Sequence, residues 1–160
     1  MNYSVKEPNE CSDVELDKFY ELVKEGGKVE IKGLKARINK CVILGFCISD
    51  NEIIGVSSIK RPSRNYREGI ISKAQIDRKY NELDFELGYS FTDKNYRKKG
   101  ISTNIKTRLL DWMKDYGGTI FSTTAISSSQ NFLLQNEFKH YGITYDGKND
   151  KNLKYYEITF

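Results

Sequence analysis

Residues that bind metals or form disulfides are scarce in this sequence. Its 160 residues include one histidine, His140, and three cysteines, and no Cys-x-x-Cys pair occurs. Because a zinc site needs several such ligands at close spacing, we expect no metal. Cys41 and Cys47 are spaced to lie on one face of a single strand and Cys11 stands apart. The sequence therefore predicts buried or incidental thiols and no disulfide framework.

Long hydrophobic stretches are lacking as well. No apolar run approaches the roughly 18–20 residues that a membrane-spanning helix requires, and the mean hydropathy is −0.62. The N-terminus, Met-Asn-Tyr-Ser-Val-Lys-Glu-Pro, does not have the charged-then-apolar order of a secretion signal. These features predict a cytoplasmic protein that does not associate with a membrane.

Common cofactor fingerprints are also missing. The sequence contains no Gly-x-x-x-x-Gly-Lys-Ser/Thr, no Gly-x-Gly-x-x-Gly and no Gly-x-Ser-x-Gly, which are the motifs of phosphate-binding loops, dinucleotide folds and hydrolase elbows. We find no internal repeat, linker or low-complexity segment. A chain of 160 residues with these properties predicts a single domain that spans residues 1–160.

What is present is hydrophobic periodicity that alternates between helix and strand. Helices are expected from Ser12, where Ser12 and Glu15 form a capping box, within residues 29–39, from Gly100 to Tyr116, and after Ser127. Strands are expected at residues 2–5, 41–49, 52–60, 83–91, 119–126, 138–145 and 153–160. Residues 63–82 read as a long polar connection with a helical piece near 72–80. The predicted fold class is α/β (α+β), with a central mixed, mostly antiparallel sheet of six to seven strands flanked by about four helices.

The chain is organised around residues 86–116. Apolar residues alternate along the strand before this stretch (Leu83, Phe85, Leu87, Tyr89, Phe91), and Asp84, Glu86, Gly88 and Ser90 fall on its other face. We expect the alternation to break near Gly88. Arg97-Lys98-Lys99-Gly100 follows, and then an apolar stripe at helical spacing (Ile101, Ile105, Leu109, Trp112, Tyr116). The free N–H groups of the helix start, the helix dipole and the basic side chains together predict an anion site suited to a pyrophosphate.

Over residues 86–103 and 119–142 the chain resembles the GNAT family of acyl-CoA N-acyltransferases. The family's pattern of Arg or Gln, two residues, Gly, one residue, and Gly or Ala stands here as Arg97-Lys98-Lys99-Gly100-Ile101-Ser102, with serine in the last place. The resemblance implies a GNAT-like fold and a donor, acetyl-CoA or another acyl-CoA, whose pyrophosphate binds this turn. It implies that backbone N–H groups near residues 89–92 hold the thioester carbonyl. The residues that it implies for the cofactor are Phe91, Thr92, Arg97, Lys98, Lys99, Gly100, Ile101, Ser102, Thr103 and Ser127, with N-capping of the following helix as the alternative role for Ser127.

Glu86 is the candidate general base. It lies on the strand on which some family members keep a catalytic glutamate, between the apolar residues Phe85 and Leu87. An outward-facing carboxylate on an amphipathic strand is the alternative reading, and Asp84 and Glu82 are the other candidates. Acyl transfer to an amine requires such a base because the ammonium must lose a proton before it attacks.

The general acid is less well defined. The family commonly keeps a tyrosine for this purpose at a position that falls near Leu133 here, where this sequence has none, which leaves other tyrosines to supply the proton. The candidates are Tyr141, which we take as the catalytic acid, and Tyr89 and Tyr145.

Residues 60–79 carry a local positive charge. They hold seven basic and two acidic side chains, for a local charge of +5 in a chain whose net charge is +4. This excess predicts an acidic or phosphate-bearing acceptor, nucleic acid included, whereas a flexible, solvated loop is the alternative.

Together these features predict an N-acyltransferase that moves an acetyl group from acetyl-CoA directly to a primary amine. No cysteine lies in an activating setting, so a covalent acyl-enzyme is not expected. Two alternatives are a catalytically silent module of the same fold that binds coenzyme A or a partner, and a nucleic-acid-directed relative that modifies a nucleobase. The sequence carries no signal for the acceptor or the oligomeric state.

Overall fold

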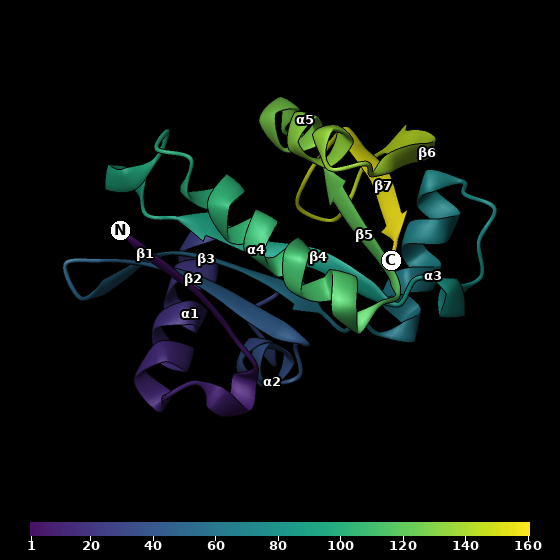
Figure 1. Ribbon diagram of the computed structural model, residues 1–160. Coiled ribbons are helices and arrows are strands. Elements are labelled where there is room, and N and C mark those ends of the chain that lie inside the picture. Colours follow the sequence, from purple (N-terminus) through teal and green to yellow (C-terminus); the bar gives the residue numbers. More distant parts are fainter. The chain divides into compact units, whose positions relative to one another are not determined.

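The computed structural model describes residues 1–160 and contains one sheet of seven strands (Figure 1). The strands are β1 (Asn2–Lys6), β2 (Ile43–Ser49), β3 (Glu52–Lys60), β4 (Phe85–Thr92), β5 (Thr119–Thr124), β6 (Lys139–Tyr145) and β7 (Leu153–Thr159). The helices are α1 (Asp13–Gly26), α2 (Leu34–Asn39), α3 (Arg64–Ala74), α4 (Ile101–Tyr116) and α5 (Ser127–Gln135), and short 3-10 turns cover Pro8–Glu10, Tyr80–Glu82 and Lys94–Tyr96.

The strand order is β1-β2-β3-β4-β5-β7-β6. β4 and β5 pair in parallel, with Phe85 opposite Ile120 and Glu86 opposite Phe121. The pairs β1–β2, β2–β3, β5–β7 and β6–β7 are antiparallel. The predicted mixed, mostly antiparallel α/β sheet is therefore confirmed.

The chain forms two compact units. The first consists of Met1–Arg61 and Leu87–Asp115, and the second of Pro62–Glu86 and Tyr116–Phe160. β4 contributes its first two residues to the second unit and its remaining residues to the first. The single functional domain expected over residues 1–160 stays a prediction.

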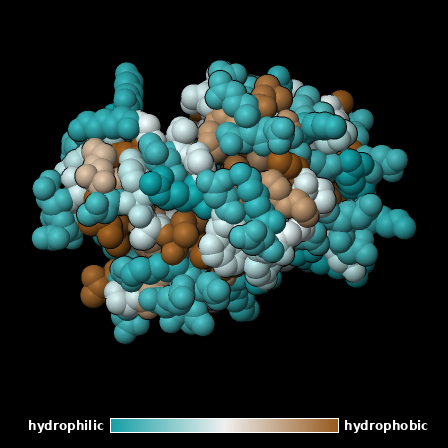
Figure 2. All heavy atoms as spheres, in the orientation of Figure 1, coloured by the Kyte–Doolittle hydropathy of each residue, from teal (hydrophilic) through white to brown (hydrophobic).

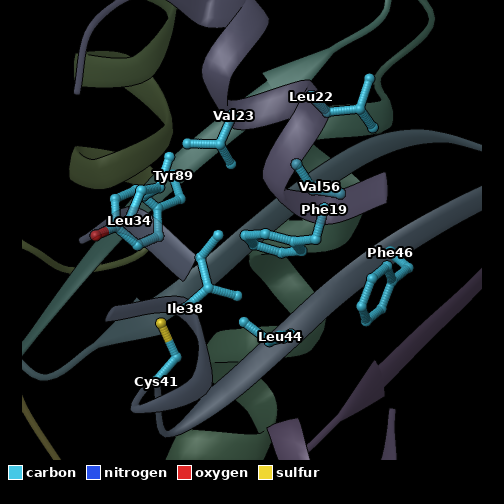
Figure 3. Close-up of a cluster of buried hydrophobic side chains, with 10 residues drawn as sticks. All are labelled: Phe19, Leu22, Val23, Leu34, Ile38, Cys41, Leu44, Phe46, Val56 and Tyr89. Atoms are coloured by element: carbon cyan, nitrogen blue, oxygen red, sulfur yellow. The ribbon is translucent and has the colours of Figure 1, made fainter. Parts of the chain in front are cut away.

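In the first unit, α1 and α2 pack on one face of β2 and β3. α1 begins where predicted, because the Ser12 hydroxyl accepts the Glu15 N–H at 3.2 Å and the Glu15 carboxylate accepts the Ser12 N–H at 2.9 Å. It ends at Gly27, whose φ of +68° is left-handed. The helices and strands share one hydrophobic cluster, drawn in Figure 3, of Phe19, Leu22, Val23, Leu34, Ile38, Cys41, Leu44, Phe46, Val56 and Tyr89.

α4 packs on the other face of the same strands, at two glycines. Leu44 and Phe46 point toward α1 and α2, so Gly45 between them points toward α4. A Cβ atom on Gly45 would lie 2.5 Å from Cγ2 of Ile105, and one on Gly55 would lie 2.6 Å from Cγ2 of Ile101. The absence of side chains at these two positions therefore lets the first turns of α4 approach the strands closely.

The buried face of α4 is wider than the predicted stripe. Ile101, Ile105 and Leu109 are buried as expected, but Tyr116 is exposed and Trp112 is only partly buried. Residues outside the stripe, Lys106, Leu110 and Met113, are buried instead.

The second unit contains helices α3 and α5 and strands β5, β6 and β7. α3 buries Ile70 and Ala74 in a cluster that also holds Ile76, Leu83, Phe121 and Tyr155. Gly142 of β6 has a φ of +74°, and a Cβ atom there would overlap the carbonyl oxygen of Ala74. A glycine at this position thus allows the C-terminal end of α3 to lie directly against β6.

Two predictions of local structure were wrong. The helix of the long connection covers Arg64–Ala74 and not residues 72–80. Ser63 caps this helix by accepting the Tyr66 N–H at 3.3 Å. The helix forms despite its polar composition because one of its faces is buried. The N-cap of α5 is Ile126 without a side-chain bond, so Ser127 is the first residue of that helix and not its cap.

The surface carries scattered hydrophobic residues. Figure 2 shows one face on which hydrophilic residues predominate and hydrophobic ones are dispersed. The exposed large hydrophobic residues lie on different elements and include Val14, Ile126 and Leu134, a distribution that is ordinary for folded proteins. None of the helices combines the length and apolar character needed to cross a membrane. The three cysteines are unpaired.

Candidate active site

The turn between β4 and α4 has the backbone geometry of an anion site. Lys98 and Gly100 both lie in the left-handed region, with φ values of +63° and +73°. The Asn104 N–H donates to the Gly100 carbonyl at 3.0 Å, so the N–H groups of residues 101–103 have no acceptor within the helix. Left-handed residues directly before a helix start turn successive N–H groups toward one point, where an anion binds.

Basic side chains line this turn. Arg97, Lys98 and Lys99 are all exposed. Nε of Arg97 donates to the Thr92 carbonyl at 3.2 Å, and its guanidinium carbon lies 5.6 Å from the centre of the Phe91 ring. Arg97 therefore ties the turn back to the end of β4. Lys98 and Lys99 are accessible to an anionic ligand, and Nζ of Lys99 lies 5.1 Å from the centre of the Tyr96 ring.

β4 departs from regular strand geometry at Tyr89, whose φ is +52°. The preceding carbonyl, of Gly88, accepts the hydroxyls of Ser57 at 3.3 Å and Ser58 at 3.2 Å. The predicted break near Gly88 is confirmed, one residue further along the chain. A tyrosine in this conformation costs about 1–3 kcal/mol, so the surrounding contacts must hold it. Such a break rotates the following peptides away from the regular ladder, as the resemblance implies for the N–H groups that hold a thioester carbonyl.

Tyr89 is anchored in the core of the first unit. Its hydroxyl accepts a hydrogen bond from Nε of Arg37 at 3.3 Å, and Nζ of Lys60 lies 4.4 Å from its ring centre. Figure 3 shows its ring beside Leu34. These contacts hold Tyr89 in the core, and its part as a candidate general acid stays a prediction.

Glu86 is buried, with 5% of its surface exposed. Its Oε1 accepts a hydrogen bond from the Tyr66 hydroxyl at 2.9 Å. Tyr66 belongs to the first turn of α3 and is 43% exposed, so one end of this pair is reachable from solvent. The alternative reading of Glu86 as an outward, solvated carboxylate is therefore wrong, because Glu86 is buried and Tyr66 of the preceding connection contacts it.

The two other carboxylates considered for the base accept hydrogen bonds from backbone N–H groups. Asp84 Oδ2 accepts the Thr119 N–H at 2.8 Å, and Glu82 Oε2 accepts the Lys79 N–H at 2.6 Å. Both therefore hold backbone in place, whereas Glu86 accepts a hydrogen bond from the side chain of Tyr66, a residue that is 43% exposed.

The charge of Glu86 also acts on a second tyrosine, Tyr145. Burial raises the pKa of Tyr145 to about 12, a hydrogen bond with Thr123 opposes this rise, and the charge of Glu86 adds to it. The phenol therefore stays protonated throughout the neutral range, and its hydroxyl can serve as a hydrogen-bond donor.

Tyr141 lies in a different network. The guanidinium carbon of Arg78 lies 4.8 Å from the centre of its ring. Arg78 pairs with Glu157 through Nε at 3.0 Å, and Glu157 also accepts the Tyr155 hydroxyl at 2.7 Å. Burial, and then the bond to Glu157, raise the pKa of Tyr155. Tyr141 makes no hydrogen bond to Glu86, and its part as general acid stays a prediction.

Sequence reasoning missed Tyr66 as a partner of Glu86. The two are 20 residues apart, and the intervening segment carries no periodic signal that pairs them. Ser127, expected at the cofactor, is exposed at the first position of α5.

The turn that precedes α4 fits the pyrophosphate of an acyl-CoA. It offers unbonded helix N–H groups, two left-handed residues and exposed lysines, which is the chemistry that a diphosphate requires. Residues able to hold the group are therefore the ones expected from the sequence around Gly100.

Known proteins match this chain by structure but not by sequence. No family model and no curated protein matches the sequence. The phosphinothricin acetyltransferase (Pat) of Sinorhizobium meliloti, a GNAT superfamily protein solved in complex with AcCoA, aligns with a TM-score of 0.70 at 12% identity, over 100% of this chain and 89% of that one. The fold is that of the GNAT acetyltransferases.

Two further structures agree. ElaA of Escherichia coli aligns with a TM-score of 0.68 at 12% identity, over 98% of this chain and 97% of that one. An acyl-CoA N-acyltransferase of Pseudomonas aeruginosa aligns with a TM-score of 0.69 at 12% identity, over 98% and 97% of the two chains. At 12% identity the likeness establishes the GNAT fold. It does not assign the substrates of these proteins to this chain.

Proposed function

We propose that this protein is an acyl-CoA-dependent N-acyltransferase that transfers an acetyl group to a primary amine. The observation that carries the proposal is the pair of features at the two ends of β4. A buried carboxylate bonded to a tyrosine lies at its start, and an anion-binding turn follows its end. The fold supports the proposal because neighbours with this fold are acetyltransferases.

The turn before α4 is the proposed donor site. The N–H groups of residues 101–103 and the side chains of Lys98 and Lys99 bind the pyrophosphate. Arg97 keeps the turn in shape through Thr92. When bound here, the acyl-CoA supplies an acyl group activated as a thioester.

Glu86 is the proposed base. It accepts one proton from the acceptor ammonium and releases it to solvent, while Tyr66 holds one carboxylate oxygen in place. The freed amine nitrogen forms the new C–N bond as the C–S bond breaks, and its second proton leaves with the thiol. Tyr145 and Tyr141 are the two phenols proposed to assist at the sulfur, and the contact of Tyr141 with Arg78 favours Tyr145.

Binding of acetyl-CoA is tested by thermal unfolding. Acetyl-CoA at about a hundred times its Kd should stabilise the protein by about 2.7 kcal/mol. The double variant Arg97→Ala, Gly100→Glu should lose this stabilisation, because it removes a cation and places a bulky anion in the turn. Arg108→Ala, which removes an exposed arginine of α4, is the matched control and should keep the stabilisation by acetyl-CoA. An equal shift in the double variant would disprove the donor site.

Transfer is tested by release of free thiol from acetyl-CoA with a panel of primary amines. Thiol release that depends on the amine, with the acetylated amine detected by mass spectrometry, would support the proposal. Binding of acetyl-CoA without turnover of any amine would instead indicate a silent module of the same fold.

A further inference from the structure

Arg67 of α3 is a partly buried cation without a partner. Its Nε is buried and donates to no acceptor, and its guanidinium forms no ion pair. Other arginines nearby are neutralised, since Arg64 pairs with Glu68 at 2.8 Å and Arg78 pairs with Glu157. A buried donor without an acceptor is uncommon in folded proteins and calls for a ligand or another explanation.

The position of Arg67 relates it to the proposed base. Arg67 shares one helix face with Ile70, Ile71 and Ala74, because these residues are three, four and seven positions further along α3. Ile70 and Ala74 are buried in the cluster against which Tyr145 packs, and the charge of Glu86 acts on Tyr145.

The neighbouring residue, Tyr66, donates directly to Glu86. Tyr66, which is bonded to the proposed base, and Arg67, a cation without an ion-pair partner, are thus consecutive residues in the first turn of α3. The same turn contains no acidic residue, and the positive end of the helix dipole adds to the field of Arg67.

We propose that the acceptor is a small primary amine that also bears one anionic group, a carboxylate or a phosphate monoester, and that Arg67 binds this group. The proposal rests on the proposed acyl transfer, since Glu86 then takes the proton of the same acceptor. A guanidinium offers two parallel N–H donors, which match either oxyanion in a bidentate arrangement.

A single anionic group fits this site better than a nucleic acid does. A phosphate backbone is bound by several free cations along a surface. Two arginines of the basic segment, Arg64 and Arg78, are instead paired with carboxylates of the same unit, whereas Arg67 alone combines a buried, unbonded nitrogen with a place next to Tyr66.

Matched amines test the proposal in the thiol-release assay. γ-Aminobutyrate is compared with butylamine, and O-phosphoethanolamine with ethanolamine, so that the two pairs separate carboxylate from phosphate. In each productive pair we expect the anionic member to have a kcat/KM higher by about thirtyfold or more. Arg67→Gln should remove this preference by lowering kcat/KM for the anionic amines, and Arg67→Lys should restore part of it because the charge is kept.

Arg64→Gln is the matched control, since it removes an arginine of the same turn that is already paired. It should leave the preference for anionic amines unchanged. Equal turnover of anionic and neutral amines, or an equal loss in the Arg64 and Arg67 variants, would overturn the proposal. Binding of a single-stranded oligonucleotide that weakens in both variants would overturn it in favour of a nucleic-acid surface.

A binding measurement separates this proposal from acyl transfer itself. Thermal unfolding is followed with the same four amines in the absence of acetyl-CoA. Stabilisation by an anionic amine that disappears in Arg67→Gln supports the anion site even where no amine is acetylated, which would disprove only the transfer. No stabilisation of the wild-type protein by either anionic amine would overturn the anion site, whatever the outcome of the transfer assay.

Discussion

At the scale of single residues, burial and partners separate candidates that look alike in the sequence. Glu82, Asp84 and Glu86 lie within five positions. The first two hold backbone N–H groups, whereas Glu86 is buried and bonded to a tyrosine hydroxyl. A buried carboxylate whose bonded partner is a tyrosine hydroxyl, rather than backbone, is the best placed of the three to take up a proton.

Glu86→Gln tests this assignment. The amide keeps the size of the side chain and can still accept the Tyr66 hydroxyl, but it cannot take a proton. We expect thiol release with a reactive amine to fall by about 10²–10⁴-fold, with the thermal stabilisation by acetyl-CoA unchanged. Asp84→Asn is the control for loss of a nearby charge. A Glu86→Gln enzyme within a few-fold of the wild-type rate would contradict the role.

The ion pair between the partly buried Arg78 and the buried Glu157 predicts a large effect on stability. Glu157 is 8% exposed and accepts bonds from Arg78 and from the Tyr155 hydroxyl. Glu157→Ala leaves a guanidinium and a buried phenol without their acceptor, and should lower the free energy of unfolding by about 2–4 kcal/mol. Urea denaturation measures this change.

The exposed pair of Arg64 and Glu68 is the matched control. Its side chains are 65% and 45% exposed, so Glu68→Ala should leave the free energy of unfolding nearly unchanged. Similar losses in the Glu157 and Glu68 variants would show that burial does not distinguish the two pairs.

At the scale of elements, the position of α4 depends on two glycines of neighbouring strands. Gly45 and Gly55 leave room for Ile105 and Ile101, which lie in the first two turns of α4. Because the proposed donor site is the start of this helix, close packing at these glycines also holds the N–H groups of the anion-binding turn.

Gly55→Ala should therefore disturb both packing and binding. The added methyl group would lie 2.6 Å from Ile101, and overpacking of this kind lowers the free energy of unfolding by about 1–3 kcal/mol. Acetyl-CoA should then bind more weakly, as isothermal calorimetry would show. Gly69→Ala is the control, because its Cβ atom meets nothing within 4 Å and alanine in a helix should stabilise by about 0.5–1 kcal/mol. Unchanged stability of Gly55→Ala would refute the packing argument.

At the scale of the whole molecule, one buried lysine should shape the dependence of stability on pH. Burial lowers the pKa of Lys106 in α4 from 10.5 to about 8. The unfolded chain therefore binds more protons than the folded one between these two values. The contribution of Lys106 to the free energy of unfolding must then rise as the pH increases from about 8 to about 10.5.

Lys106→Met isolates this contribution, because other groups titrate in the same range. The burial of Cys11, whose pKa is raised to about 11, acts in the opposite direction and is common to both proteins. The advantage of Lys106→Met over the wild type should be largest below pH 8 and should shrink by about 2–3 kcal/mol toward pH 10.5. Urea denaturation at a series of pH values measures it, and a constant difference would contradict the prediction.

Features with a short-range origin were correctly predicted from the sequence. Ser12 and Glu15 cap α1, the strands expected at residues 41–49 and 52–60 form β2 and β3, and the turn around Gly100 opens α4. The irregularity of β4 was also foreseen, within one residue. Each of these depends on neighbours along the chain, whose identities the sequence displays directly.

The sequence by itself thus determined the order of elements, the mixed sheet and the turn around Gly100 that opens α4. Only the tertiary structure decided that Tyr66 holds Glu86, that Arg67 stays unpaired and that Arg78 covers Tyr141. The physical reason is that local periodicity specifies which face of an element is apolar, whereas the pairing of polar side chains far apart in the chain depends on where the packed elements place them. α3 illustrates both. Its apolar residues are at helical spacing in the sequence, but the hydrogen bond from its first turn to Glu86 of β4 is seen only in the packed structure.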